Sequence, residues 1–272
     1  MVASGTNWTA VEDAVAEASA LGTVGVAIEG PGTARWSHHG DRTFGAASTV
    51  KIPIMIEIFR QIDAGTRSLD DPYTVTAEDH TPGSGVLLHL HTGIELTLND
   101  LIYLMISISD NMATNILIRM AGMDAVNRTM ADIGMTNSVL GREMKGRPAQ
   151  AGERENLATA NDYARAIRAS IDGTAASRAS CDAMLAMLEK QQNGRRIARH
   201  LPEVASVRWG SKTGSIAGVT NDVGFIIAPN GTLVIAVFCE NFPDQHVGEE
   251  VIGDISRAAM AATGVVGPRY TS

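Results

Sequence analysis

The sequence of 272 residues is poor in cysteine and contains no long apolar run. Its two cysteines, Cys181 and Cys239, lie far apart and form no metal-ligand spacing, so we expect two buried free thiols. The apolar runs fall well short of the ~18 residues of a membrane span. No basic N-terminal segment precedes an apolar stretch. The chain as given therefore predicts a cytoplasmic protein, or a periplasmic or secreted one if an export signal was removed.

Positive charge is also in deficit, with 22 lysines and arginines against 30 acidic residues and a net charge of -8. Proteins that bind duplex DNA or anionic membranes usually carry a basic excess, so we expect neither a nucleic-acid nor a membrane partner. Only four residues are lysines, which makes a lysine inside a motif informative: Lys51, Lys145, Lys190 and Lys212. A hydrophobic content of 44% excludes wholesale disorder.

Strand patterns occupy both ends of the chain, and helical patterns fill the middle. Alternating and β-branched residues predict strands at 23–28, 34–38, 205–212, 223–228 and 232–239. Helical spacing predicts helices at 8–21, 48–64, 98–107, 112–120, 124–133, 162–171, 181–191 and 248–262. We therefore predict an α/β (α+β) fold in which one antiparallel sheet, built from both ends, is flanked by terminal helices and carries an all-helical insertion. Within this single unit, the sheet part covers about 1–47 and 205–272, and the helical part about 48–204.

A serine and a lysine lie one turn apart at the start of the second predicted helix. Ser48 and Lys51 would share one face of that helix. A serine hydroxyl is a weak nucleophile, and a lysine whose pKa is lowered by burial or by neighbouring positive charge can act as its base. The helix N-terminus adds N–H donors and a positive dipole. This pair predicts nucleophilic catalysis only if further motifs accompany it.

Two further polar motifs carry groups that could serve the same chemistry. The Ser109 hydroxyl could relay a proton and the Asn111 amide could hold a substrate carbonyl, although a helix cap and turn would use the same residues. Lys212, at the end of a predicted strand, could attract a carboxylate. Gly214 allows close backbone approach, and the Ser215 N–H could donate to an oxyanion. The alternative for the motif that begins at Lys212 is a strand that runs into a turn.

Together these motifs resemble the S-x-x-K, S-D-N and K-T-G signature of class A β-lactamases and penicillin-binding proteins. Phe44-Gly45-Ala46-Ala47, Ala113-Thr114-Asn115 and Thr220-Asn221-Asp222 add to the resemblance, which covers roughly residues 10 to 265. It implies a sheet domain and an all-helical domain with the active site between them. It also implies a small-molecule substrate, a β-lactam or a related amide or ester, and a reaction without metal or other cofactor.

The resemblance further implies a role for each motif residue. Ser48 would be the acylated nucleophile, Lys51 its proton-transfer partner, and Ser109 the group that passes a proton to the leaving nitrogen. The substrate-binding residues would be Asn111 for the side-chain amide, Lys212 and Thr213 for the carboxylate, and Gly214 and Ser215 beside the oxyanion, which the backbone N–H groups of Ser48 and Ser215 would hold.

A long loop in the helical part departs from the family pattern. Class A β-lactamases carry Glu-x-x-Leu-Asn there, and its glutamate activates the deacylating water; this pattern is absent, and Met144 takes the glutamate position. Glu143, one residue away, is the candidate base, with a solvated loop carboxylate as the alternative. Glu153 and Glu155 lie too near the end of the loop for this role, and we expect them to pair with Arg142.

Three functions remain open from the sequence. The leading one is a serine hydrolase that opens β-lactam amides through an acyl-enzyme at Ser48. An esterase, amidase or peptidase on the same scaffold is favoured by the missing glutamate pattern and the missing export signal. A penicillin-binding protein that deacylates slowly is the third.

Overall fold

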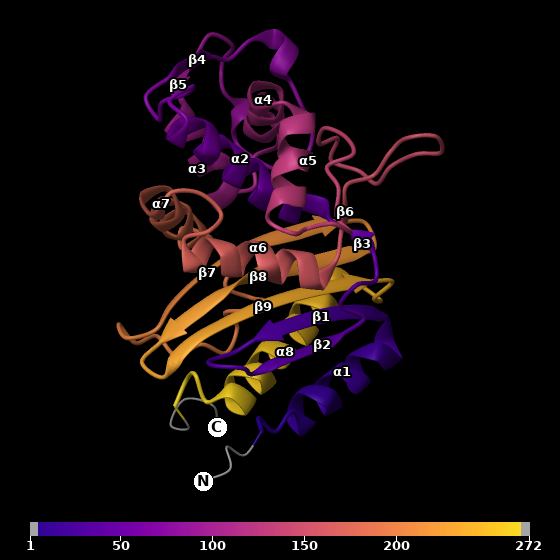
Figure 1. Cartoon of the computed structure of the whole chain (residues 1–272). Helices are drawn as coiled ribbons and strands as arrows, with labels where there is room; N and C mark the ends of the chain where they lie inside the picture. The colour runs from indigo at the N-terminus through magenta and orange to yellow at the C-terminus, as the bar shows by residue number, and fades with distance from the viewer. Residues whose placement is uncertain (1–4, 268–272) are drawn as a thin grey trace.

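A five-stranded antiparallel sheet forms one half of the protein, whose computed structural model describes residues 5–267 (Figure 1). The strand order is β2-β1-β9-β8-β7. The strands are β1 (Thr23–Glu29), β2 (Arg35–His38), β7 (Arg208–Ile216), β8 (Val219–Ala228) and β9 (Gly231–Glu240). Because β1 pairs with β9, the two ends of the sequence share one sheet, and the predicted architecture is confirmed.

The alternation of side chains along the strands gives the sheet two apolar faces. Val24, Val26 and Ile28 of β1 face the terminal helices α1 (Thr9–Leu21) and α8 (Gln245–Thr263), which pack against each other. Ala27 and β9 residue Phe238 belong to the opposite core, where α6 (Ala160–Asp172) lies across the sheet (Figure 1). The sheet is thus covered on both faces, which matches its mostly buried central strands.

The helical part packs around α2 (Lys51–Asp63), whose first nine residues are all buried. The surrounding helices are α3 (Leu98–Ser107), α4 (Asn111–Ala121), α5 (Met123–Asp132) and α7 (Arg178–Leu188). A helix that is buried all round must lie at the centre of its layer. The division into a sheet part and a helical part stays a prediction; α6, which falls within the predicted helical part, packs on the sheet.

Several short elements were not predicted, because two to four residues carry no periodic pattern. Two small ladders pair β3 (Phe44–Gly45) with β6 (Leu157–Ala158), and β4 (Pro72–Thr74) with β5 (Glu95–Thr97). Three 3-10 turns are η1 (Ala47–Val50), η2 (Ala77–Asp79) and η3 (Leu87–His89). The β3–β6 ladder matters for the site, because it fixes the residues just before Ser48 against the end of the long loop, where the Ala46 N–H donates to the Asn156 carbonyl over 2.8 Å.

Two predicted boundaries were wrong near the motifs. The helix predicted from Ser48 begins as the 3-10 turn η1 and becomes α-helical only at Lys51. The strand predicted to end at Lys212 continues as β7 to Ile216, because residues 212–216 pair with β8. The cysteine prediction is confirmed, since Cys181 and Cys239 are both free and buried. Between residues 5 and 267, no helix combines the length and the apolarity that crossing a membrane requires.

Phe238 joins the sheet to the helix that covers it, so its truncation should be costly. The side chain is fully buried, with ring centroids 5.9 Å from Phe44 and 5.5 Å from Tyr163 of α6. We predict that Phe238→Ala lowers the free energy of unfolding by ~3–5 kcal/mol, measured by urea denaturation. The exposed aromatic Tyr103 offers the matched control, and Tyr103→Ala should change stability by less than ~1 kcal/mol. Equal losses in the two variants would contradict this account of the core.

Candidate active site

Ser48 lies in a tight turn between the sheet and the helical part. It belongs to η1, and the residue before it, Ala47, has a φ of 46°, a left-handed conformation that non-glycine residues seldom adopt. The Thr49 hydroxyl donates to the Ala46 carbonyl over 2.7 Å and stabilises this turn. Ser48 itself is only 8% exposed. The turn therefore holds the hydroxyl in a fixed place at the start of α2.

Lys51 is fully buried and donates to acceptors of the second motif. Its Nζ lies 2.7 Å from the Ser109 carbonyl, 2.9 Å from Ser109 Oγ and 3.0 Å from Asn111 Oδ1. Burial lowers the pKa of Lys51 well below its ordinary value, and the charge of Lys212 lowers it further, against the opposing effect of Asp110. Lys51 therefore gives up a proton more readily than an exposed lysine does, and Ser109 Oγ lies within hydrogen-bond distance of its Nζ.

The second motif is both a helix cap and a part of the site. Asp110 is the N-cap of α4, and its carboxylate accepts from the Ala113 N–H over 3.0 Å and from the Val86 and Leu87 N–H groups over 2.7 and 2.9 Å. Ser109 adopts a φ of 61° just before it. This conformation, with Asp110 turned into the cap, leaves Ser109 directed toward Lys51 from the turn between α3 and α4.

Lys212 reaches the same hydroxyl from strand β7. Its buried Nζ lies 3.2 Å from Ser109 Oγ and 2.9 Å from the Thr213 carbonyl. Burial lowers the pKa of Lys212 to about 7, with Asp222 raising it and Arg196 lowering it. The two lysines thus meet at one serine, and near neutral pH Lys212 is divided between its charged and neutral forms.

Gly214 brings β7 into direct contact with the turn that carries Ser48. A Cβ atom on Gly214 would lie 3.0 Å from the Ala46 carbonyl oxygen and 3.2 Å from the Ser48 nitrogen, closer than side chains normally pack. A larger residue would have to push the turn away by a few tenths of an ångström, so the close approach favours glycine. The next residue, Ser215, lines the same pocket as Ser48, so both backbone N–H groups belong to one small region of the site.

Sequence reasoning gave no role to two residues that hold these strands in place. The buried Arg196 donates to the Gly214 carbonyl over 3.1 Å and to Ser215 Oγ over 2.6 Å. Asn221 Nδ2 donates to the Gly45 carbonyl over 2.9 Å. Asn221 stood beside the third motif in the family resemblance, which is the signal that could have identified it; Arg196 had no such signal.

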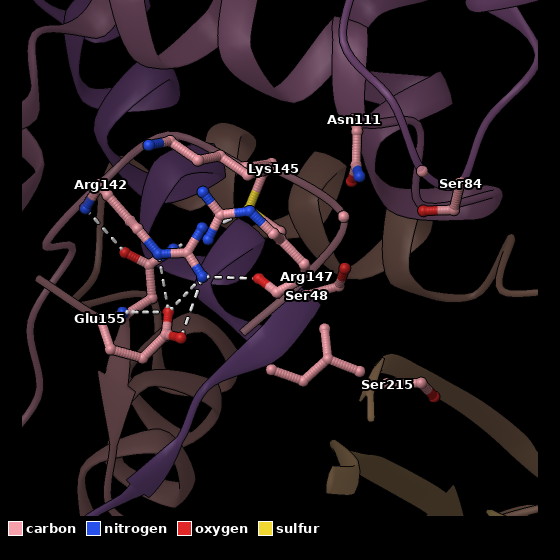
Figure 2. Close-up of a pocket in the computed structure, with 13 residues that line it drawn as sticks. Ser48, Ser84, Asn111, Arg142, Lys145, Arg147, Glu155 and Ser215 are labelled. Carbon is pink, nitrogen blue, oxygen red and sulfur yellow. Dashed lines mark hydrogen bonds and ion pairs between the residues drawn. The ribbon is translucent and has the colours of Figure 1, made fainter. Parts of the chain in front are cut away.

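Ser48 opens onto a small pocket of about 110 Å³ (Figure 2). Figure 2 shows side chains of the 141–156 loop on one side of Ser48, and Ser84, Asn111 and Ser215 on the other. The lining residues that the motifs did not reveal include Gly83, Ser84, Arg142, Met144, Glu155, Asn156 and Ile216. The structure therefore brings Ser48, Asn111 and Ser215 together around one cavity.

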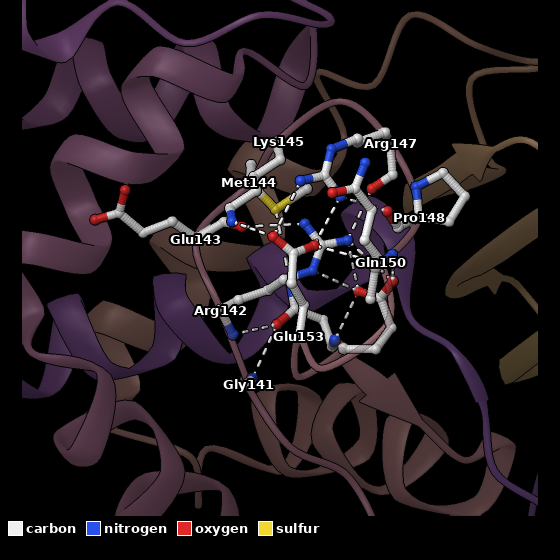
Figure 3. A network of polar contacts seen from close by, with 12 residues as sticks. Gly141, Arg142, Glu143, Met144, Lys145, Arg147, Pro148, Gln150 and Glu153 are labelled. Carbon is white, nitrogen blue, oxygen red and sulfur yellow. Dashed lines mark hydrogen bonds and ion pairs between the residues drawn. The ribbon is translucent and has the colours of Figure 1, made fainter.

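Glu143 does not face this pocket. Its carboxylate, with a side chain 37% exposed, lies 3.5 Å from Arg119 Nη1, and Figure 3 shows it pointing away from the rest of the loop. Met144 is buried instead, and its backbone is held at both ends by Asn115, whose Oδ1 accepts from the Met144 N–H over 2.8 Å and whose Nδ2 donates to the Met144 carbonyl over 3.0 Å. Met144, and not Glu143, thus lines the pocket with Ser48.

The only carboxylate among the residues lining the pocket with Ser48 is Glu155, and it is fully engaged. It accepts from Arg142 Nη2 over 2.9 Å, from the Ala149 N–H over 2.7 Å and from the Asn156 N–H over 2.8 Å. Burial would raise the pKa of Glu155, but these hydrogen bonds lower it below its ordinary value. Glu155 is therefore an ion held by structural contacts and a poor acceptor for a proton from water.

The ion pairs of the loop confirm half of the sequence prediction. Glu155 pairs with Arg142 as expected. Glu153 does not; it pairs with Lys145 over 2.6 Å and with Arg147 over 2.7 Å (Figure 3). Both cations precede Glu153 within the same loop.

Comparison with known proteins gives one consistent result. A family model described as the beta-lactamase enzyme family matches residues 8–263. A β-lactamase from Rhodobacter capsulatus is 30% identical over 245 residues, 88% of this chain and 82% of that protein. The structure of a β-lactamase from Sphaerobacter thermophilus matches with a TM-score of 0.94 at 60% identity, covering 96% of this chain and 100% of the other. A mutant of PBP-A in an acyl-enzyme complex with penicillin G matches with a TM-score of 0.83 at 26% identity, covering 94% and 97%.

The lowered pKa of Lys212 makes a prediction about stability. Between pH 7 and 10.5 the unfolded chain holds a proton at Lys212 that the native chain has lost, so the free energy of unfolding increases with pH. Below pH 7 both states hold this proton, and the native state carries the full cost of burying a cation. We predict that Lys212→Met is more stable than wild type by ~2–4 kcal/mol at pH 6, and that the difference shrinks toward pH 10. Urea denaturation across this range measures it.

Lys190, an exposed lysine, supplies the matched control. Lys190→Met should shift stability little and by the same amount at every pH. A pH-independent difference for Lys212→Met would mean that Lys212 keeps an ordinary pKa in the folded protein.

Proposed function

The chain belongs to the beta-lactamase enzyme family and is a serine hydrolase of the β-lactamase type, and we propose that Ser48 is the nucleophile that its substrates acylate. The observation that carries this assignment is the convergence of two buried lysines on the hydroxyl of Ser109, beside the pocket onto which Ser48 opens. The same arrangement supports β-lactam amides as the substrate class, because it supplies a base, a proton relay and an anion-binding cation within one site.

Lys51 is suited to accept the proton that Ser48 loses on attack. Burial lowers its pKa well below the ordinary value, which makes its neutral form easier to reach than in an exposed lysine. As Ser48 Oγ bonds to the lactam carbonyl carbon, its proton passes to Lys51 Nζ and the carbonyl oxygen becomes negative. The N–H groups of Ser48 and Ser215 would stabilise that oxygen, and the close contact of Gly214 with the Ser48 turn supports this placement.

Ser109 is suited to return the proton when the lactam C–N bond breaks. Its Oγ accepts from both lysines, so it can give its own proton to the leaving nitrogen and take one from Lys51. The cationic form of Lys212, with Thr213 beside it, would attract the substrate carboxylate. A bound carboxylate would raise the pKa of Lys212 and hold it in its charged form.

Slow deacylation is favoured by what faces Ser48 on the loop side. A water that attacks the acyl-enzyme ester must give up a proton, and Met144 accepts none. Glu143 points to Arg119, and Glu155 is held by Arg142. These contacts support a second candidate function on the same scaffold, a penicillin-binding protein whose acyl-enzyme persists.

The nucleophile can be tested directly by mass. We predict that wild type gains the mass of one penicillin G molecule and that Ser48→Ala slows this acylation by at least ~10³-fold, because loss of a nucleophile removes the bond-forming group. Intact-protein mass spectrometry over time measures the adduct. Ser84→Ala removes another hydroxyl from the same pocket and should still be acylated. Acylation of Ser48→Ala at the wild-type rate would overturn the assignment.

The deacylating base is tested by two substitutions in the loop. We predict that Glu143→Gln loses its penicillin adduct at the wild-type rate, because its carboxylate lies against Arg119. Met144→Glu should lose the adduct ~10²–10⁴-fold faster, the usual contribution of a positioned general base. Decay of the adduct after removal of free penicillin gives both rates.

Met144→Gln is the matched control for the second variant, since it adds a polar group of the same length without a basic carboxylate. It should not accelerate the decay. Accumulation of adduct in Glu143→Gln alone would identify Glu143 as the base, and it would contradict the prediction that the contact with Arg119 keeps this carboxylate away from the acyl-enzyme.

A further inference from the structure

Five of the residues assigned to the site divide between two pockets that share no lining residue. Ser48, Asn111 and Ser215 line the first, of about 110 Å³. Ser109 and Thr213 line a second, of about 480 Å³, which we call the leaving-side pocket. Ser109 is the group proposed to protonate the leaving nitrogen, so the second pocket lies where the substrate extends beyond that nitrogen. The larger space is therefore on the leaving side of the bond that breaks.

One wall of the leaving-side pocket is a short segment after α7 that is fixed by its own amides. The carbonyl oxygen of the Gln191 side chain accepts from the Gln192 and Asn193 N–H groups over 3.0 and 3.1 Å. Asn193 Oδ1 accepts from the Arg195 N–H over 3.0 Å. These contacts occupy the side-chain oxygens of Gln191 and Asn193. Within residues 5–267, the Gln192 side-chain amide and Asn193 Nδ2 make no hydrogen bond, so two sets of donors remain for a ligand at the wall.

The same wall carries one positive charge, on Arg195, and no carboxylate among the residues that line the pocket. Glu249, with a side chain 1% exposed, lies 3.4 Å from Arg195 and 3.2 Å from Arg196, so one carboxylate faces two guanidinium groups. The Arg195 side chain is 63% exposed, and Arg195 lines the pocket. In a chain of net charge -8, an exposed cation next to unengaged amide donors favours an anion.

We propose that the leaving-side pocket binds an anionic substituent carried by the substrate beyond its leaving nitrogen, with Arg195 as the charge partner and the Gln192 and Asn193 amides as hydrogen-bond donors. This inference rests on the proposed acylation of Ser48. It concerns a different substrate group from the carboxylate assigned to Lys212 and Thr213. Its consequence is a preference among β-lactams that share one acyl group and differ on the other side.

Two cephalosporins provide this comparison. Cefamandole and cefonicid carry the same mandelyl acyl group, and their leaving-side tetrazoles bear a methyl and an anionic sulfomethyl group respectively. The measurement is the second-order rate of acylation, followed by intact mass at low salt. We expect Arg195→Ala to lower the cefonicid-to-cefamandole ratio by about five-fold, the upper end for one partly exposed ion pair. Arg195→Glu should lower it further, and Gln192→Glu, which adds an exposed negative charge at the wall, should also lower it.

Arg199→Ala is the matched control, because Arg199 follows on the same segment but pairs with Glu250 outside the pocket. It should leave the ratio unchanged. The inference is overturned if both compounds acylate the protein and the ratio is the same in wild type, Arg195→Ala and Arg195→Glu. Failure of cefonicid alone to acylate wild type would also overturn the inference. Failure of both compounds would instead contradict the role proposed for Ser48, so the two outcomes are distinguishable.

Discussion

The site depends on the burial of two lysines around one serine. Lys51 and Lys212 come from different halves of the structure, and each loses its hydration where they meet at Ser109. Desolvation lowers the pKa of both lysines, and the charge of Lys212 lowers that of Lys51 further. The Ser109 and Thr213 oxygens and the Asn111 amide oxygen accept hydrogen bonds from the two lysine Nζ atoms. The pKa of each lysine thereby falls below its ordinary value, and that of Lys212 falls to about 7. Ser109 can occupy the shared position only because Asp110 fixes the turn behind it.

Much of the architecture could be predicted because its elements are long and periodic. The strands at both ends and the central helices each carry a pattern over several residues, and the antiparallel sheet follows from their order. The failures lie where pairing, rather than pattern, decides the structure. Residues 213–216 extend β7 because β8 lies beside them, and nothing local distinguishes them from a turn. The 3-10 turn η1 likewise packs against β7, β8 and β6, which lie far from it in the sequence.

The residues of the site show the same difference between local patterns and long-range contacts. The residues that the motifs name are brought together around Ser48 and Ser109, whereas those that hold them in place act across long distances in the sequence. Arg196 reaches the carbonyl of Gly214, and Asn115 reaches Met144. Such contacts are set by the fold, and no regular spacing in the sequence predicts them. Glu143 illustrates the limit most clearly, because a shift of one residue along the loop separates a side chain that faces Ser48 from one that faces Arg119.

The pairing of β1 with β9 also determines when the protein can become active during its synthesis. Thr23 to Glu29 must pair with residues 234–240, and β7 must already lie against the turn that carries Ser48. The ribosome synthesises β1 near the start of translation and β9 near its end, so β1 cannot pair with β9 until nearly the whole chain has been made. Such long-range pairing slows folding and leaves an unpaired strand edge exposed in the meantime. The nascent polypeptide therefore has no assembled site until β9 has emerged, and α1 has no completed sheet to cover before then.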